Sequence, residues 1–537
     1  MGAGPTPSAP AAAVGQSGGR RYLEAALYLL LALALAIPAW APLTRPGLPA
    51  TAAGPLPALE FYAALQGDAP ILAQPLGRWQ SPGPWPFWTA RFFHLLGADG
   101  VASLKLGLWL ALIILAVGVY LWGGRTATHR GGVLAAVLVL FTPALLGGIY
   151  QGGEWAAVWV LAGAGLAGAG LAGAGLAGWG VLRGRGPALG LAAGGGLIAA
   201  ASLPGLGLLA GLGLAALALG TRRWTAAVAL AAGGAVGLLL SAPWSRPAAL
   251  PPTAIAPLFY QLIEPGWLWG TATLAEVEAP VFSLGLALVG LLLMAVWSFP
   301  RPDPSPAAEM THARRTHAAR MRRTWLLTLT AGLVFALLSL FPGLPLLASL
   351  ASPLHLLLIS LPFLAVAAAS AVYHISDLRE MTPLWAALLI LVLVGAGPSL
   401  SPAAIDRPLP ERPAAIFGQD QVILLDLRSE GRLQPGETVI VHADWLALKP
   451  ADFDYNIFLH LDDAAGATLA QVDVQPQNGA RPMTGWRPGE IISDSYSLAI
   501  PPDAPAGLRL RLGLYNWQTL ARLPVGGEDG VELMRSD

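Results

Sequence analysis

The chain has 537 residues, of which 55% are hydrophobic and only 12% charged, and its mean hydropathy is +0.60. This composition excludes a soluble globular protein, which would need far more polar surface. The formal net charge is zero, so no partnership with nucleic acid is expected, and the absence of cysteine excludes disulfides, thiolate metal sites and cysteine nucleophiles.

Long apolar runs fill most of the first 400 residues. A run of about 20 residues can cross the ~30 Å hydrocarbon core of a bilayer as a helix. Residues 1–19 are rich in Gly, Pro, Ala and Ser and are expected to be disordered. The run after Arg20 and Arg21 is too long for a signal-peptide core and has no convincing cleavage site, which indicates a retained membrane helix.

The expected fold class is therefore a polytopic α-helical membrane protein with about eleven spans over residues 20–400. The stretch 187–221 leaves two interpretations open, because Leu203-Pro204-Gly205 is either a turn between two short helices or a kink in one long helix. A re-entrant 187–221 would reduce the count to nine. The eleven spans lie at about 22–43, 101–122, 132–150, 155–181, 187–203, 205–221, 225–243, 280–299, 325–341, 352–374 and 384–400.

If there are eleven spans, the arginine clusters fall on one side of the membrane, because they precede the first span and follow even-numbered spans. By the positive-inside rule, this pattern predicts a multi-pass plasma-membrane protein with a cytoplasmic N-terminus and a C-terminus outside. The arginines on the expected inner side are Arg20, Arg21, Arg125, Arg130, Arg183, Arg185, Arg222, Arg223, Arg301, Arg314, Arg315, Arg320, Arg322, Arg323 and Arg379.

The fourth span contains an internal Gly-Leu-Ala-Gly-Ala repeat from Gly165 to Gly178. Its five-residue period does not match the 3.6 residues of a helical turn, so its leucines spiral around the helix. We interpret it as filler in a closely packed helix, with a helix dimer contact as the alternative.

After Leu400 the composition changes to a Pro-rich linker, 401–419, and then to short β-type runs over 420–537. Turn sequences such as Gln434-Pro435-Gly436 separate the runs, which favours an all-β sandwich domain appended outside the membrane. The expected strands are 421–427, 438–448, 455–461, 468–474, 491–500 and 508–515.

The expected outer loop 44–100 carries the motif Leu59-Glu60-Phe61-Tyr62-Ala63-Ala64-Leu65-Gln66-Gly67-Asp68. It resembles the first-loop motif of family 39-type GT-C glycosyltransferases, an Asp-Glu-x-Tyr followed by Leu-x-Gly-Asp. The resemblance covers about residues 55–155 and weakens beyond them. It implies a membrane enzyme that takes a sugar from a polyprenyl-phosphate donor, with membrane lipids around it and an unknown glycan, lipid or protein as acceptor.

In that family the adjacent acids bind metal or deprotonate an acceptor hydroxyl, which needs a carboxylate near the nucleophile. Glu60 falls on the second acid, but Leu59 stands where the first belongs. Three interpretations stay open: Glu60 acts alone or with Asp68, the register is shifted, or the chemistry has been lost. The resemblance thus implies catalytic roles for Glu60 and Asp68 and leaves a divalent metal cofactor open, with no ligand assigned. The alternative for Glu60 is an ordinary carboxylate at a loop or helix start.

Further candidates for substrate binding lie in this loop, in the expected outer loop 244–279 and at span ends. Arginine binds phosphate bidentately and aromatic faces suit sugar rings, although an interfacial aromatic belt also explains Trp and Tyr there. A helix dipole alone favours an acid at a span start, and a histidine inside a span either contacts phosphate or is hydrogen-bonded at the interface. The candidates are Arg78, Glu154, Arg246, Tyr260, Glu264, Trp267 and His355.

In the β-rich region, His442-Ala443-Asp444 and His460-Leu461-Asp462 each place a His and an Asp on one strand face. If these two strands paired, the four side chains would meet, and a metal site is the less favoured interpretation of that pattern. The aromatic residues of this region are expected in its core and rim rather than in a sugar platform.

Two functions follow. The first is a membrane glycosyltransferase in which Glu60 or Asp68 deprotonates an acceptor hydroxyl while Arg78, Arg246 or His355 holds the lipid phosphate. The second is a non-catalytic cell-envelope scaffold that keeps the same fold, which Leu59 favours. A transporter is a weaker third, because its polar residues should lie near mid-membrane.

Overall fold

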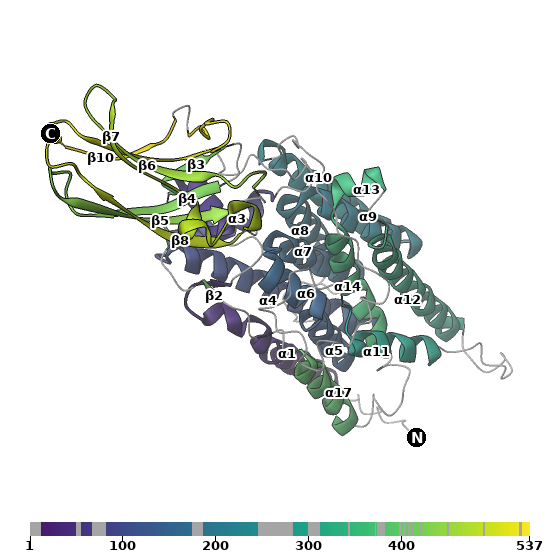
Figure 1. Cartoon of the computed structure of the whole chain (residues 1–537). Coiled ribbons are helices and arrows are strands. Elements are labelled where there is room, and N and C mark those ends of the chain that lie inside the picture. The colour runs from purple at the N-terminus through teal and green to yellow at the C-terminus, as the bar shows by residue number, and fades with distance from the viewer. Residues whose placement is uncertain are drawn as a thin grey trace, which may run out of the picture. The chain divides into compact units, whose positions relative to one another are not determined.

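A computed structural model of the chain divides into two compact units (Figure 1). The helical unit comprises Met1–Arg45, Gln74–Ala98 and Ala102–Pro402, and the strand unit comprises Pro46–Ala73, Asp99–Val101 and Ala403–Asp537. The structure describes all residues except 1–11, 50–54, 67–81, 174–185, 245–282, 299–311, 342–343, 371, 373–381, 397–399, 401–403, 406–408, 411, 419–421, 448–450, 487–488, 526–528 and 537.

Apolar helices rich in Leu, Ala and Gly build the helical unit. Proline opens several of them, at a position where its missing N–H would have no helical partner anyway. The helices are α1 (Ala12–Trp40), α3 (Pro84–Leu95), α4 (Gly100–Thr126), α5 (His129–Leu140), α6 (Pro143–Gly147), α7 (Trp155–Leu171), α8 (Gly186–Ser202), α9 (Pro204–Gly220), α10 (Trp224–Ser241), α11 (Leu286–Trp297), α12 (His312–Leu338), α13 (Pro345–Leu350), α14 (Pro353–Ala369) and α17 (Thr382–Gly395).

Within the described ranges, four helical segments are long and apolar enough to cross a membrane: Tyr22–Thr44, Gly100–Thr126, Trp224–Ser241 and Met321–Leu338. A fifth is present if α5 and the following Pro143–Gly152, bent by 43°, form one span. Such segments make the chain an integral membrane protein. Shorter apolar helices overlap the other expected spans, so the count of eleven stays a prediction, as does the orientation of the termini.

The stretch 187–221 forms two helices rather than one kinked helix. Helix α8 ends at Ser202, Leu203 is extended, and Pro204 opens α9. A Cβ added to Gly207 would lie 2.5 Å from the carbonyl oxygen of Ala199, so the two helices touch where the chain turns. The interpretation of Leu203-Pro204-Gly205 as a turn is therefore confirmed.

The glycines of the fourth expected span let helices of the same chain approach each other. A Cβ on either Gly163 of α7 or Gly195 of α8 would overlap the carbonyl oxygen of the other. A Cβ on Gly118 of α4 would lie 2.7 Å from the backbone of Gly165. The described part of the repeat thus packs within the chain, as expected for small residues at helix contacts in lipid.

The strand unit contains two four-stranded antiparallel sheets, in the orders β10-β9-β6-β7 and β3-β4-β5-β8, and a short β1-β2 pair (Figure 1). One apolar core takes residues from both four-stranded sheets, including Trp445, Leu459 and Leu512. The strands are β1 (Leu48–Pro49), β2 (Ala404–Ile405), β3 (Ala415–Phe417), β4 (Val422–Glu430), β5 (Thr438–Ala447), β6 (Asn456–Asp462), β7 (Thr468–Val474), β8 (Ile491–Ala499), β9 (Arg509–Tyr515) and β10 (Val531–Arg535).

Each of the six strands expected from the sequence overlaps one of these strands, from β4 to β9. The condition under which the two His-and-Asp motifs would meet, pairing of their strands, is not fulfilled. Strand β5, with His442 and Asp444, pairs with β4 and β8, whereas β6, with His460 and Asp462, pairs with β7 and β9 in the other sheet. Consecutive strands here change sheets, so the two motifs do not meet as strand neighbours.

The described part of the outer-loop motif, residues 59–66, lies in a helix, α2 (Leu56–Gln66), that belongs to the strand unit. Leu59 and Ala63 are one helical turn apart and share a face. That face packs on Ile423, Leu425 and Leu446 of strands β4 and β5, and Leu59 is fully buried there. A leucine stands at this position because it anchors the helix to the sheet.

Candidate functional site

Glu154 lies at a break between two helical segments. A π-helical turn, Gly148–Gly152, ends at Gly153, which takes a left-handed conformation (φ 73°) that glycine adopts at little cost. The backbone N–H of Glu154 then donates to the carbonyl oxygen of Gly148 at 2.9 Å, and α7 begins at Trp155. Single π-helical turns are frequent at functional sites, and this one sets the direction of the Glu154 side chain.

His355 lies in the first turn of α14, where the sequence Ser352-Pro353-Leu354-His355 forms a reciprocal capping box. The Ser352 hydroxyl oxygen accepts a hydrogen bond from the backbone N–H of His355 at 3.2 Å. In return, the backbone N–H of Ser352 donates to the ring Nδ1 of His355 at 3.3 Å. The histidine takes the place that Glu or Gln usually holds in this motif.

The two residues meet across 201 positions of sequence, with Nε2 of His355 lying 2.7 Å from Oε2 of Glu154. A backbone N–H can only donate, so Nδ1 of His355 is the acceptor of the Ser352 bond and the ring proton is assigned to Nε2. Nε2 then donates to the Glu154 carboxylate. The sequence thus builds a chain of hydrogen bonds from the Ser352 backbone through a neutral imidazole to a carboxylate.

Burial is uneven across this pair. The side chain of His355 is 8% exposed, whereas that of Glu154 is 30% exposed. A carboxylate held on one oxygen and open on its accessible side can accept a hydrogen bond from a substrate hydroxyl or take its proton. Glu154 is the N-cap residue of α7, but its side chain makes no capping hydrogen bond there and contacts His355 instead.

The same geometry changes the role expected for His355. Both ring nitrogens are engaged, one by Ser352 and one by Glu154, and the ring faces a carboxylate that would repel a phosphate. This arrangement favours a positioning role for His355 over contact with a lipid phosphate.

A divalent metal does not fit the pair as it stands. In the part of the chain that the structure describes, no group of three or more His, Asp or Glu side chains could hold a metal ion. Glu154 and His355 supply two donor atoms, and the histidine nitrogen nearest the carboxylate carries the ring proton. No step through a metal is therefore derived.

The first-loop acid Glu60 is half-buried on α2, between the buried Leu59 and Phe61. It belongs to the strand unit, whereas Glu154 and His355 belong to the helical unit. The other sequence candidates lie outside the described residues: Asp68, Arg78, Arg246, Tyr260, Glu264 and Trp267.

The two His-and-Asp motifs of the strand unit make separate contacts. On β5, Nδ1 of His442 lies 2.7 Å from the Ser495 hydroxyl, and Asp444 accepts a hydrogen bond of 2.5 Å from Ser493. Arg428 lies 3.7 Å from Asp444 at the same exposed surface. This cluster of charged and hydroxyl side chains lines a pocket on the β4-β5-β8 face.

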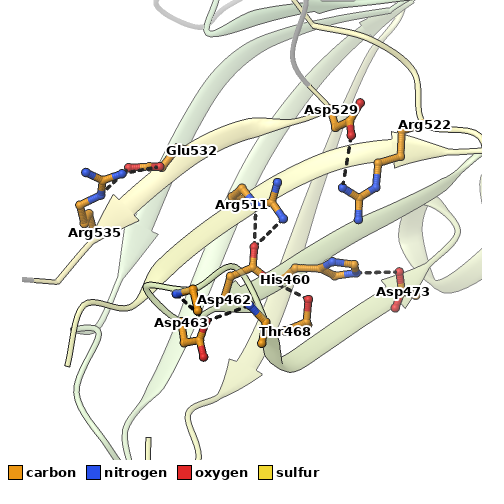
Figure 2. A network of polar contacts seen from close by, with 12 residues as sticks. His460, Asp462, Asp463, Thr468, Asp473, Arg511, Arg522, Asp529, Glu532 and Arg535 are labelled. Carbon is orange, nitrogen blue, oxygen red and sulfur yellow. Dashed lines mark hydrogen bonds and ion pairs between the residues drawn. The ribbon is translucent and has the colours of Figure 1, made fainter. Parts of the chain in front are cut away.

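On β6, Asp462 is buried and binds Arg511 at 2.5 Å and the Thr468 hydroxyl at 2.7 Å (Figure 2). His460 lies beside it, with Nε2 3.5 Å from Asp473. Burial lowers the pKa of His460, and Asp473 opposes that effect in part. This network joins β6, β7 and β9 and is structural, because its charged groups are matched within the sheet.

Sequence reasoning found Glu154 and His355 separately but missed their contact and the role of Ser352. A Ser-Pro-x-His sequence at a helix start is a visible capping signal, and it alone would have fixed the orientation of the imidazole. Among the aromatic residues of the strand unit, Trp486 and Tyr496 are buried in the core, and Trp517 is 47% exposed.

No protein-family model and no curated protein matches the chain. Among solved structures, the apo oligosaccharyltransferase of Archaeoglobus fulgidus is similar at 14% identity over 71% of this chain and 56% of that chain, with a TM-score of 0.35. Its complex with zinc and sulfate gives 14% identity, 70% and 53% coverage and a TM-score of 0.34. ArnT from Cupriavidus metallidurans, in the apo state, gives 16% identity, 65% and 78% coverage and a TM-score of 0.31.

The chain thus spans about half the length of the oligosaccharyltransferase. At these TM-scores the likeness supports no conclusion about residues, substrates or activity.

Proposed function

We propose that this chain is a GT-C-like membrane glycosyltransferase that moves a sugar from a polyprenyl-phosphate donor to an acceptor hydroxyl on the outer face of the membrane. The observation that carries the proposal is the Glu154–His355 pair, a part-exposed carboxylate fixed by a buried neutral imidazole at the ends of two apolar helices. The motif resemblance over residues 55–155 supplies the reaction class, and the positive-inside pattern supplies the orientation.

In the proposed reaction, the acceptor oxygen attacks the anomeric carbon as the bond from that carbon to the phosphate oxygen breaks. The lipid phosphate leaves with the bonding electrons, and the acceptor proton passes to a carboxylate. Glu60 or Asp68 is the proposed base, and Glu154 binds a sugar hydroxyl. His355 keeps the Glu154 carboxylate oriented through the hydrogen bond from its Nε2–H. Arg78 or Arg246 is the proposed partner of the lipid phosphate.

The test measures sugar transfer in membranes that contain the full-length chain, with polyprenyl-phosphate sugars of several kinds as donors. Loss of the general base should lower the rate by about a hundredfold or more, in Glu60→Gln where Glu60 is the base and in Asp68→Asn where Asp68 is. Glu154→Gln should raise KM for the sugar substrate by a larger factor than it lowers kcat. Glu24→Gln, at an exposed position of α1, is the matched control and should leave transfer unchanged.

The second candidate is a non-catalytic scaffold, which one observation favours. The position of the missing family acid is filled by Leu59, which is fully buried against the sheet and has a packing role instead. If no donor supports transfer, the enzyme proposal fails and the scaffold replaces it. If both Glu60→Gln and Glu154→Gln keep full transfer, the chain is still a transferase but the roles proposed for these two residues are wrong.

A further inference from the structure

A short, tightly built loop follows β9. The strand ends at Tyr515, and Tyr515 forms a β-bridge with Arg522, so the chain between them makes a closed turn. Asn516 organises this turn: its backbone N–H donates to Ala521 at 2.8 Å, and its carbonyl oxygen accepts from Leu520 at 2.7 Å. Its side-chain oxygen also accepts from the backbone N–H groups of Gln518 and Thr519.

The turn is also anchored where it returns to the sheet. The guanidinium of Arg522 lies 4.6 Å above the ring of Phe458 and pairs with Asp529 at 3.9 Å, as Figure 2 shows for the two charged residues. The N–H of Leu523 donates to the carbonyl oxygen of Leu514 at 2.8 Å, which continues the ladder. The loop Asn516–Ala521, here called the apolar turn, is therefore a fixed projection.

The apolar turn carries two large hydrophobic side chains with exposed surface, and the ring of Trp517 also packs beside that of Phe453, with centroids 5.8 Å apart. Trp517 is 47% exposed and Leu520 is 73% exposed. Leu520 has φ +60°, a left-handed conformation that costs a side-chain-bearing residue about 1 kcal/mol or more. The hydrogen bonds of the turn hold this backbone conformation, and the Leu520 side chain gains little burial from it.

The composition of the tip decides between partners. The tip, Trp517-Gln518-Thr519-Leu520-Ala521, contains no charged residue, so transfer into a less polar phase carries no ionic desolvation cost. Tryptophan prefers the bilayer interface and leucine the hydrocarbon below it. A sugar could stack on the Trp517 ring, but an exposed leucine would add little to sugar binding.

We propose that the apolar turn is a membrane-contacting element that inserts Trp517 and Leu520 into the interfacial layer of the bilayer. The strand unit is held near a bilayer by the membrane spans of the same chain, to which it is joined at several points along the sequence. Because the strand unit is attached to a membrane-spanning chain, the effective concentration of bilayer surface around it is high. Insertion of two apolar side chains is then enough for membrane contact, whereas a free domain would need more apolar residues.

The chain has no cysteine, which allows single labels to report on the turn. We would attach a spin label to Leu520→Cys and, separately, to Gln518→Cys, in full-length protein in nanodiscs of phosphatidylethanolamine and phosphatidylglycerol. Ser497→Cys on β8 is the matched exposed control. Power saturation then compares collisions with oxygen, which concentrates in hydrocarbon, and with a water-soluble nickel chelate.

The expected result is a several-fold higher ratio of oxygen to nickel collisions at 520 and 518 than at 497. Trp517→Ala should lower that ratio at both tip positions. Equal nickel accessibility at all three positions would place the turn in water and overturn the proposal. Protection of the tip labels by added oligosaccharide, but not by lipid, would overturn it in favour of a sugar-binding turn.

Discussion

Replacing Leu59 by alanine tests how α2 is held on the sheet. Leu59 is fully buried among Ile423, Leu425 and Leu446, so its truncation removes buried methyl groups and leaves a cavity under the helix. Leucine-to-alanine changes at such sites cost about 2–5 kcal/mol. A loss of about 3 kcal/mol in the free energy of local opening would speed amide exchange in α2 by roughly a hundredfold.

Hydrogen–deuterium exchange of the Leu56–Gln66 segment in the full-length protein measures this opening. Glu60→Ala is the matched control, because Glu60 is on the same helix but outside the apolar cluster. Leu59→Asp regenerates the family's pair of acids, yet it should release α2 even more strongly, because a buried unpaired carboxylate costs several kcal/mol. If α2 amides exchange no faster in Leu59→Ala than in Glu60→Ala, the anchoring role of Leu59 is refuted.

Three further changes test the remaining geometry. Gly153→Ala should destabilise the helical unit by about 1 kcal/mol, because alanine resists a φ of 73°, whereas Gly148→Ala, at φ −57°, should melt like the wild type. Asp462→Ala should cost about 3 kcal/mol in thermal unfolding of the strand unit, because it leaves a half-buried guanidinium without its carboxylate; a change below 1 kcal/mol would contradict the network. His460 has a lowered folded-state pKa, so the strand unit should keep full stability above about pH 6.5 and lose it as pH falls through the ordinary histidine range, where the unfolded chain takes up the proton first. His460→Gln should abolish that loss while His442→Gln keeps it, and equal pH profiles for the two variants would count against the assignment.

Local patterns predicted the elements of this fold well and their partners poorly. The strands β4 to β9 were found because turn residues separate runs of β-branched and aromatic side chains. The sheet changes between β5 and β6 were not, because a period of two residues says which face a side chain takes but not which strand lies next to it. The sequence around Pro204 allowed either a turn between two helices or a kink in one helix. The close approach of Gly207 to Ala199 shows that the chain turns there.

The candidate site shows the same division. Glu154 and His355 stand out in sequence because ionisable residues at span ends are few, but their contact joins residues 201 positions apart and has no local signature. The attachment of α2 to β4 and β5 is equally non-local. The motif comparison placed Leu59 in the position of an acid, and only its burial shows what the leucine does there.

The pairing of early and late segments in the strand unit also has a consequence for biosynthesis. Leu59 packs on Leu446, and Leu48 pairs with Ile405, so both early residues wait for partners made much later. At an elongation rate of about 5–20 residues per second, Leu59 waits roughly 20 to 80 seconds. During that interval the apolar face of α2 has no partner strands to pack on and is open to aggregation. We expect a chaperone or the bilayer surface to cover it until β4 and β5 are made.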